Sequence, residues 1–397
     1  MDVRLGYKQT EVGTIPLDWS TISLESACVA RGLVRGPFGG ALKKESFVRD
    51  GQKVYEQRNA IYRSAEVGTY FIDEQKYREL ERSAVKPGDF IVSCSGTIGR
   101  IYRIPDAAPS GVINQALLKI DTNNARIDPS YFYYCFDWDE FQQRISDNTH
   151  GGAMQNLVGM SIFRTIEIAH PPLPEQRAIA AALSDVDALI RALDHLIAKK
   201  RDLKQAAMQQ LLTGQYRLPG HSGEWEINRL GDVVQIRKGQ LITEKDAVNG
   251  NIPVIAGGKA PSYFHNRANR IGTTITISAS GANAGYVALY EVPIFASDCS
   301  TISESGTYSI RFIYYFLLMR QEQIYKAQTG GAQPHIHPSD LNPILIDLPS
   351  ITEQTAIAAV LSDMDAEIAA LEVRRDKTRA LKQDMMQELL TGRTRLV

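Results

Sequence analysis

The sequence predicts an α+β protein in which two globular, mixed α/β heads are separated by two long helices packed as an antiparallel coiled coil, with a pseudo-two-fold internal repeat. The main observation is a segment that begins at Leu173 and recurs from Ile351 without a gap, with more than half of its aligned positions identical. A β-rich stretch with the same order of elements precedes each copy. The expected boundaries are 1–172 for the first head, 173–214 for the central helix, 215–349 for the second head and 350–397 for the C-terminal helix.

Each copy of the repeat is expected to form one long helix, because its apolar residues recur at alternating spacings of three and four, as in a coiled-coil seam. The seam residues are Leu183, Val186, Ile190, Leu193 and Ile197 in the first copy, and Leu361, Met364, Ile368 and Leu371 in the second. About 38 residues at about 1.5 Å each give a rod of roughly 55 to 60 Å. Neither rod can bury its stripe alone, so the two copies are expected to pack against each other.

Charged residues interrupt both seams, at 199–201 and at 374–377. They predict a solvated face in the middle of the helices. The alternative is a basic midsection that faces another macromolecule.

The composition is that of an ordinary globular protein, with 44% hydrophobic and 22% charged residues and a net charge of −1,. This balance excludes a strongly basic protein but not a local basic patch. The four cysteines lie far apart without a CxxC pair, so buried reduced thiols are expected rather than a disulfide framework or a zinc site,. The longest apolar run, 312–319, is too short to span a bilayer, and no apolar stretch follows the N-terminal charges, so we expect a cytoplasmic protein with no membrane partner,.

Each head opens with a tryptophan that a leucine follows five residues later, at Trp19 and at Trp225. Both tryptophans are expected to be structural anchors. An aromatic-rich helix, near 131–134 in the first head and 312–316 in the second, is expected in the core.

A polar, basic stretch at 31–63 carries eight Lys or Arg residues against three acidic ones. A weaker counterpart lies at 259–270 in the second head. Arg, Asn and Gln side chains of this kind bind phosphates or base edges in nucleic acids, although an ordinary solvated loop has the same composition. The candidates from these stretches are Arg58, Asn59 and Arg63 in the first head, and Asn266 and Arg267 in the second.

Both heads also contain alternating β-branched residues followed by Ser-x-Ser-Gly, at 89–99 and 275–285, which indicates a strand that enters a tight turn,. Such a turn can cradle a phosphate with its amides, or it can be a hairpin without a ligand. A Gly-Gly-Ala loop follows in each head, at 151–153 and 330–332. The candidates for base or phosphate contact from the turns and loops are Thr97, Gln155, Asn156, Asn283, Gln333 and His335.

Motifs for catalysis are missing from the sequence. The string Gly257-Gly258-Lys259 lacks the spacing of a Walker A motif, no GxSxG elbow occurs, and no Asn-Pro-Pro-aromatic tetrapeptide of adenine or cytosine methyltransferases is present,. His335 and His337 without a clear third ligand make a weak metal site. No catalytic and no metal-binding residues are therefore expected in this chain.

The Pro-Glu-Gln start at 174–176, the Leu-Leu-Thr-Gly end at 211–214, their second copies at 352–354 and 389–392, and the Ile-Pro-x-x-Trp opening resemble the specificity (S) subunits of type I restriction-modification systems. The resemblance covers essentially the whole chain. In the second copy Thr352 replaces Pro174 and Thr355 replaces Arg177, which marks the second helix start less sharply.

The resemblance implies a non-catalytic reader of double-stranded DNA. Each head would be a target recognition domain for one half of an asymmetric, bipartite sequence, and the helices would set the gap. Methyltransferase (M) subunits would bring S-adenosylmethionine and modify an adenine in each half, while restriction (R) subunits would bring ATP- and Mg-dependent translocation and cleavage. Two major-groove readers on one face of B-DNA need half-sites about one turn, roughly 34 Å, apart, which helices of this length can span.

Two other functions compete with this interpretation. A coiled-coil scaffold that joins two protein-binding modules predicts no sequence-dependent binding to duplex DNA. A self-sufficient nuclease or methyltransferase needs the cofactor motifs that the sequence lacks.

Overall fold

The computed structural model describes residues 5–38, 40–147, 159–330 and 333–396. It divides into two compact units, one of Met1–Arg191 with Asp376–Val397 and one of Ala192–Arg375. The division passes through both long helices, α6 (Leu173–Leu211) and α11 (Ile351–Leu390). Each unit therefore contains one head together with a part of each long helix.

The first head is built on two sheets, of four and five strands. The four-stranded sheet has the order β10 (Ile101–Arg103), β9 (Phe90–Ser93), β12 (Leu117–Thr122), β4 (Cys28–Arg35). The five-stranded sheet has the order β5 (Phe47–Val48), β7 (Phe71–Ile72), β6 (Gln52–Tyr55), β11 (Gly111–Ile113), β8 (Ala84–Val85). Two-stranded ribbons join β1 (Tyr7–Thr10) to β2 (Gly13–Pro16), and β3 (Ser20–Ser23) to β13 (Glu167–His170). The helices of this head are α1 (Gln57–Ile61), α2 (Glu74–Glu79), α3 (Pro129–Asp137), α4 (Asp139–Asp147) and α5 (Met160–Thr165), with 3-10 turns at Lys44–Ser46 and Glu81–Ser83.

The second head repeats this plan in a smaller form. Its four-stranded sheet has the order β15 (Arg237–Lys238), β21 (Cys299–Ser303), β18 (Thr274–Ser278), β19 (Val287–Tyr290), which matches β4, β12, β9 and β10. Its three-stranded sheet has the order β17 (Tyr263–His265), β16 (Ile252–Ile255), β20 (Phe295–Ala296), which matches β7, β6 and β11. A ribbon joins β14 (Glu226–Arg229) to β22 (Leu345–Leu348). The helices are α7 (Leu230–Val233), α8 (Ile310–Met319), α9 (Gln321–Lys326) and α10 (Pro338–Leu341), with a 3-10 turn at Glu244–Asp246.

The two long helices pack antiparallel within each unit. In the first unit Lys382 of α11 forms an ion pair with Asp187 of α6 at 2.8 Å, and in the second unit Lys204 of α6 pairs with Asp365 of α11. These pairs are the same positions of the repeat with the helices exchanged. Seam residues such as Leu183, Leu193, Ile197, Leu361 and Ile368 are buried, which confirms the predicted packing.

Several charged residues that interrupt the seam form ion pairs between the two helices. Lys200 contacts Glu367 at 2.6 Å, Arg201 contacts Glu372, and Arg375 lies 3.6 Å from Asp194. These contacts tie the helices together in the second unit, a role that neither of the two sequence interpretations included.

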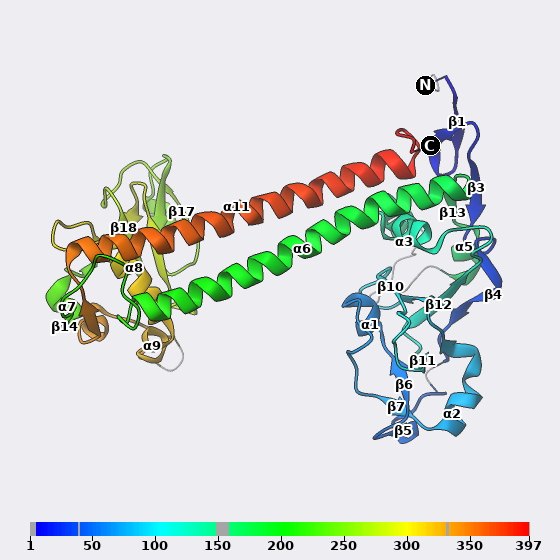
Figure 1. The fold of residues 1–397 in the computed structure, drawn as a ribbon, viewed down its shortest axis with the longest axis horizontal. Helices are drawn as coiled ribbons and strands as arrows, with labels where there is room; N and C mark the ends of the chain where they lie inside the picture. The colour runs from blue at the N-terminus through cyan, green and yellow to red at the C-terminus, as the bar shows by residue number, and fades with distance from the viewer. Residues whose placement is uncertain (1–4, 39, 148–158, 331–332, 397) are drawn as a thin grey trace. The chain divides into compact units, whose positions relative to one another are not determined.

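The aromatic helices α3 and α8 lie in the cores and also fix each head to the long helices (Figure 1). The Tyr134 hydroxyl of α3 donates to Asp187 at 3.0 Å, and the Tyr315 hydroxyl of α8 donates to Asp365 at 2.8 Å. The predicted core position of both helices is confirmed. All four cysteines are free and buried, as expected.

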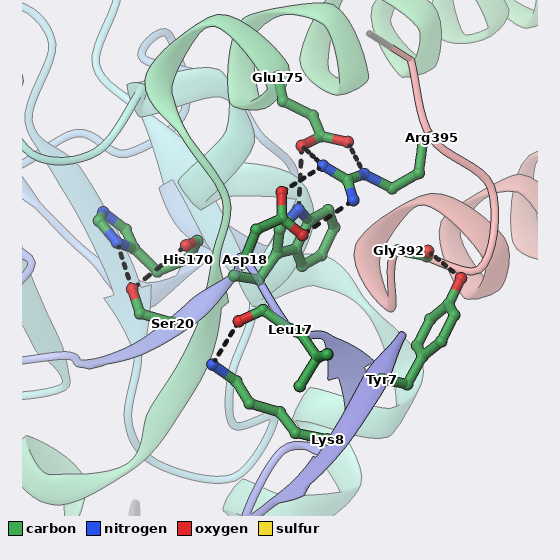
Figure 2. Close-up of polar contacts among 10 residues, drawn as sticks. Tyr7, Lys8, Leu17, Asp18, Ser20, His170, Glu175, Gly392 and Arg395 are labelled. Carbon is green, nitrogen blue, oxygen red and sulfur yellow. Dashed lines mark hydrogen bonds and ion pairs between the residues drawn. The ribbon is translucent and has the colours of Figure 1, made fainter. Parts of the chain in front are cut away.

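A buried glutamate near the start of each long helix closes its unit. In the first unit the Trp19 indole donates to Glu175 at 2.9 Å, and Arg395 bridges Glu175 and Asp18 (Figure 2). We call Trp19, Glu175 and Arg395 the first lock. The tryptophan is 1% exposed, which confirms it as an anchor.

The second unit contains the same arrangement at the repeated positions. Trp225 donates to Glu353 at 3.3 Å, and Arg217 forms a two-pronged contact with the same carboxylate at 2.6 and 2.7 Å. We call Trp225, Glu353 and Arg217 the second lock. The two locks show that the repeat extends to individual side-chain contacts.

Candidate nucleic-acid interface

The Ser-Gly turn of the first head leaves one edge of the four-stranded sheet. Strands β9 and β4 both pair antiparallel with β12, so their C-terminal ends lie at the same edge. The turn begins after Ser93 and ends at Gly99, whose φ of 79° belongs to the left-handed region that favours glycine,. A Cβ at Gly99 would lie 2.0 Å from the Gln142 side-chain oxygen of α4, so the turn approaches this helix closely at Gly99.

The second head forms the corresponding edge. Strands β15 and β18 both pair antiparallel with β21, and the turn after Ser278 returns at Gly285, with φ of 83°. A Cβ at Gly285 would lie 2.9 Å from Ile324 of α9. The strand-then-turn prediction is thus confirmed in both heads, and in both a short helix supports the turn.

In the second head the structure brings together the Ser-Gly turn and the segment that follows the Gly-Gly-Ala loop. Ser280 and His335 form an antiparallel bridge, the Ile336 amide donates to the Ala279 carbonyl at 3.0 Å, and the Gly281 amide donates to Pro334 at 3.0 Å. The candidates Gln333 and His335 therefore lie beside the turn that carries Asn283. Gln333 is exposed, while His335 and Asn283 are half-buried.

The polar groups at this edge of the second head include a carboxylate that the sequence analysis missed. Asp298 follows β20 and accepts a hydrogen bond from the Ser280 hydroxyl. The Ser278 hydroxyl is buried and has no hydrogen-bond partner among the described residues, while the Lys259 ammonium lies 5.5 Å from the centre of the Tyr286 ring. Asp298 lies two residues beyond β20, in a stretch for which the sequence analysis predicted no element.

Equivalent positions of the two heads carry different side chains at this edge. By strand pairing with β11 and β20, Gln57 corresponds to Gly257. Gln57 lies against the turn of the first head, with its amide nitrogen 3.8 Å from where a Cβ of Gly96 would be. A Cβ at Gly257 would instead lie 2.7 Å from the Ser280 carbonyl, so that position has no room for a side chain. The edge is thus shaped by side chains of different size in the two heads.

The candidates of the basic stretch in the first head lie in or after α1, which packs against β9 and β10. Arg58 and Thr97 are exposed, on the helix and the turn. Arg63 pairs with Asp137 at 2.6 Å and lies over the Tyr133 ring. Burial raises the pKa of Asp137, although the Arg63 guanidinium opposes the shift. Arg63 thus links the end of α1 to α3, while 43% of its side chain remains exposed to solvent.

Asn59 needs a correction, because it does not lie on the surface. It is 0% exposed, its Oδ1 accepts from the Glu56 amide, and its Nδ2 donates to the carbonyls of Ser64 and Val67. Asparagine caps and braces irregular backbone in this way as readily as it binds bases. Its hydrogen-bonding groups are used inside the head, so we assign it to the support of the 56–67 segment.

Two candidates of the second head are separated from the others. Asn266 and Arg267 follow β17, whose end pairs with Ile252 at the start of β16, whereas Gly257 and the turn lie beyond the other end of β16. Both are exposed, but they belong to a different edge of the head. Gln155 and Asn156 lie outside the described residues.

The arrangement can donate and accept hydrogen bonds through the backbone and side chains at the sheet edge. Within the described ranges, no group of three or more His, Cys, Asp or Glu side chains could hold a metal ion. None of the helices in these ranges is long and apolar enough to cross a membrane. The fold and this edge define a duplicated binding scaffold with two unlike polar surfaces.

Comparison with known proteins identifies the scaffold. The family described as Type I restriction modification DNA specificity domain matches residues 36–199 and 222–378. The chain is 26% identical over 321 residues to the type I restriction enzyme MjaVIII specificity subunit of Methanocaldococcus jannaschii, covering 72% of this chain and 75% of that one. It is 22% identical to the putative MjaX specificity subunit of the same organism, covering 98% and 97%.

A solved structure has the same fold over nearly the whole chain. The crystal structure of a type I restriction-modification system S subunit from M. genitalium superposes with a TM-score of 0.63 at 17% identity, covering 98% of both chains. With the family match over both heads, the chain belongs to the type I restriction-modification specificity subunits. Its heads are accordingly target recognition domains.

Proposed function

We propose that the chain reads an asymmetric, bipartite sequence in double-stranded DNA as the non-catalytic specificity subunit of a type I complex. One target recognition domain reads each half of the target. Methyltransferase and restriction subunits, which bring S-adenosylmethionine, ATP and Mg, are directed to the DNA and carry out adenine methylation or cleavage. The complex is proposed to act in the cytoplasm.

The observation that carries the proposal is the contrast between a repeated scaffold and unlike edges. The locks and the lysine–aspartate pairs Lys382–Asp187 and Lys204–Asp365 recur at equivalent positions. The sheet edge, in contrast, has Gln57 in the first head and Gly257 with Asp298 in the second. Repeated support with different polar surfaces is expected of a protein that reads two different half-sites.

The experiment is to map modified adenines across the genome of cells that express this chain with its methyltransferase, and of cells that lack it. We expect a bipartite motif with an unread spacer that disappears with the chain. An unchanged methylation pattern under an active methyltransferase would favour the alternative function, a scaffold that joins two protein-binding modules.

Single substitutions test the assignment of halves. We expect Gln333→Ala to relax reading at one half-site only, and Gln155→Ala to relax the other, with a loss of about 1 to 3 kcal/mol for each base contact removed. Asn228→Ala is the matched control, because Asn228 lies in the β14–β22 ribbon and is not one of the candidates for DNA contact. Equal loss at both halves, or loss of folding, would contradict the assignment.

A further inference from the structure

The two heads each hold one large apolar side chain in solvent at the same place in the fold. Phe38 is 92% exposed and Leu241 is 77% exposed. Each lies two residues after a glycine that is bound to the first residue of a strand inside the four-stranded sheet. The Gly36 amide donates to the Leu117 carbonyl of β12 at 2.9 Å, and the Gly239 amide donates to the Cys299 carbonyl of β21 at 2.7 Å. The heads have little sequence in common here, so the shared position comes from the fold.

Both glycines bring the loop against the backbone of the sheet edge. A Cβ at Gly36 would lie 1.8 Å from the Asn114 carbonyl oxygen, and one at Gly239 would lie 2.1 Å from the Ser297 carbonyl oxygen. No larger residue fits at either position. The close approach fixes where the following apolar residue leaves the head.

The backbone on both sides of Leu241 is anchored. The Gln240 amide donates to the Ala296 carbonyl at 2.9 Å, and the Ile242 amide donates to the Ser297 hydroxyl at 3.2 Å. In the first head the Phe38 carbonyl accepts a hydrogen bond from the Ala41 amide at 2.8 Å. An exposed apolar side chain on an anchored backbone loses little conformational freedom when it binds.

The surroundings of both side chains are polar. Exposed residues close to them in the sequence include Lys43, Lys44 and Glu45 after Phe38, and Lys238, Gln240, Thr243 and Glu244 around Leu241. A protein-docking surface needs a contiguous apolar patch, and an apolar residue flanked in sequence by charged and polar residues does not provide one. An apolar side chain with lysines close in the sequence, two in the first head and Lys238 in the second, suits a duplex, in which phosphates flank stacked bases,.

Phe38 and Leu241 also leave the same sheet edge as the Ser-Gly turns, because β4 and β9 end together, as do β15 and β18. We propose that Phe38 and Leu241 insert into the base stack of DNA, one in each half-site, and fix the register of the neighbouring polar contacts. The proposal rests on the proposed DNA-reading function. It adds an apolar contact to the stacked bases that the polar candidates do not make.

The test uses the chain assembled with its methyltransferase subunits and a duplex that carries the mapped motif, with 2-aminopurine at successive positions of each half. We expect Phe38→Ala to weaken binding by about 10- to 100-fold, since a buried aromatic or leucine side chain contributes to that extent. The fluorescence increase on binding should be lost in one half-site only. Leu241→Ala should abolish it in the other half, and Leu241→Phe should retain it.

Matched controls come from the other end of the same sheets. Ile271, 82% exposed and preceding β18, and Val29, near the start of β4, are apolar residues away from the edge. Ile271→Ala and Val29→Ala should leave affinity and fluorescence unchanged, and the alanine variants at 38 and 241 should keep the wild-type melting temperature.

Three results separate the possibilities. Unchanged affinity and fluorescence in Phe38→Ala and Leu241→Ala, with the wild-type motif intact, overturns the insertion but not the proposed function. Loss of methyltransferase association with DNA reading intact also overturns it, in favour of protein docking. A wild-type complex that reads no bipartite motif refutes the proposed function on which the inference rests.

Discussion

Glu175 is the buried carboxylate at the centre of the first lock. Its side chain is 1% exposed and accepts hydrogen bonds from Trp19 and Arg395 (Figure 2). We expect Glu175→Ala to destabilise the first unit by about 2 to 4 kcal/mol, because it leaves the buried Trp19 indole without its acceptor and leaves Arg395 with Asp18 as its remaining carboxylate partner in the first lock,. Urea unfolding followed by Trp fluorescence measures the loss.

The control for this substitution is Lys8→Ala. Lys8 donates to the Leu17 carbonyl at 3.0 Å in an exposed contact, so its removal should change the free energy of unfolding by less than about 0.5 kcal/mol,. A similar loss from both substitutions would show that Glu175 does not act through the first lock.

Arg395 also makes the stability of the first unit depend on pH in the acidic range. The hydrogen bond from Arg395 lowers the pKa of Asp18 below its ordinary value. The pKa is therefore lower in the folded state than in the unfolded state, so this contribution to stability is complete above the unfolded pKa and is lost as pH falls through the folded one. We expect the stability difference between wild type and Arg395→Ala to shrink below about pH 4, measured by unfolding across pH.

The buried thiols are expected to be unreactive in the folded protein. Burial raises the pKa of Cys28, Cys94, Cys135 and Cys299 to about 12. Since the thiolate is the reactive form, alkylation by iodoacetamide at pH 8 should be slow for all four and become fast in denaturant. Rapid modification of one thiol without denaturant would contradict its burial.

At the scale of residues, the packing role of the large aromatic side chains could be predicted from the sequence, but the surroundings of single polar side chains could not. Trp19 and Trp225 were correctly predicted as anchors, because a large aromatic residue repeated before each head has a simple packing role. Asn59 was misjudged, because an asparagine in a polar stretch has the same appearance whether it braces backbone or faces solvent. Asp298 was missed, since its position beside the turn depends on parallel pairing between strands far apart in sequence.

At the scale of elements, each head is joined to the long helices by a lysine, an aspartate and a tyrosine. Lys382 is 2.8 Å from Asp187 and lies over the Tyr134 ring, and Lys204 makes the same contacts with Asp365 and Tyr315. The Lys382 and Asp187 side chains are only 12% and 21% exposed, so their attraction is less screened than that of an open surface pair,.

A double-mutant cycle measures this contact. We expect Asp187→Ala and Lys382→Ala to be coupled by about 0.5 to 1.5 kcal/mol in thermal unfolding. Arg78 and Glu74 of α2, which are 77% and 57% exposed, are the control pair, with an expected coupling below about 0.5 kcal/mol,. Equal coupling energies in the two pairs would mean that the lower exposure of the Lys382–Asp187 pair does not strengthen it.

The long helices and the turns were the elements most readily predicted. A heptad seam and a Ser-Gly turn are local patterns, and both kinds of element begin and end close to where the sequence marks them. The ion pairs in the middle of α6 and α11 were not predicted, because the partners Glu367 and Glu372 are identified only once the register between the helices is known.

At the scale of the whole molecule, the chain consists of two similar units that are closed by separate locks. We expect deletion of residues 391–397 to raise hydrogen exchange around Trp19 and β1 to β3, because Arg395 and the Gly392 carbonyl, which accepts from Tyr7 at 3.0 Å, are removed,. The second head should keep its protection.

Arg217→Ala is the reciprocal variant. It removes the partner of Glu353 from the second lock, so exchange should rise around Trp225 and the start of α11 while the first head is unchanged. Increased exchange throughout both heads in either variant would show that the two units unfold as one.

The first lock also sets an order on biosynthesis. The second lock is complete once Glu353 has been made, whereas the first requires Arg395, although the Trp19 and Glu175 that it joins are synthesised much earlier. At roughly 5 to 20 residues per second, a ribosome supplies Arg395 about 2 to 8 s after Glu353. The head that is translated first is therefore the last to complete its lock. Until Arg395 has been synthesised, Glu175 and the Trp19 ring lack their contacts with this arginine.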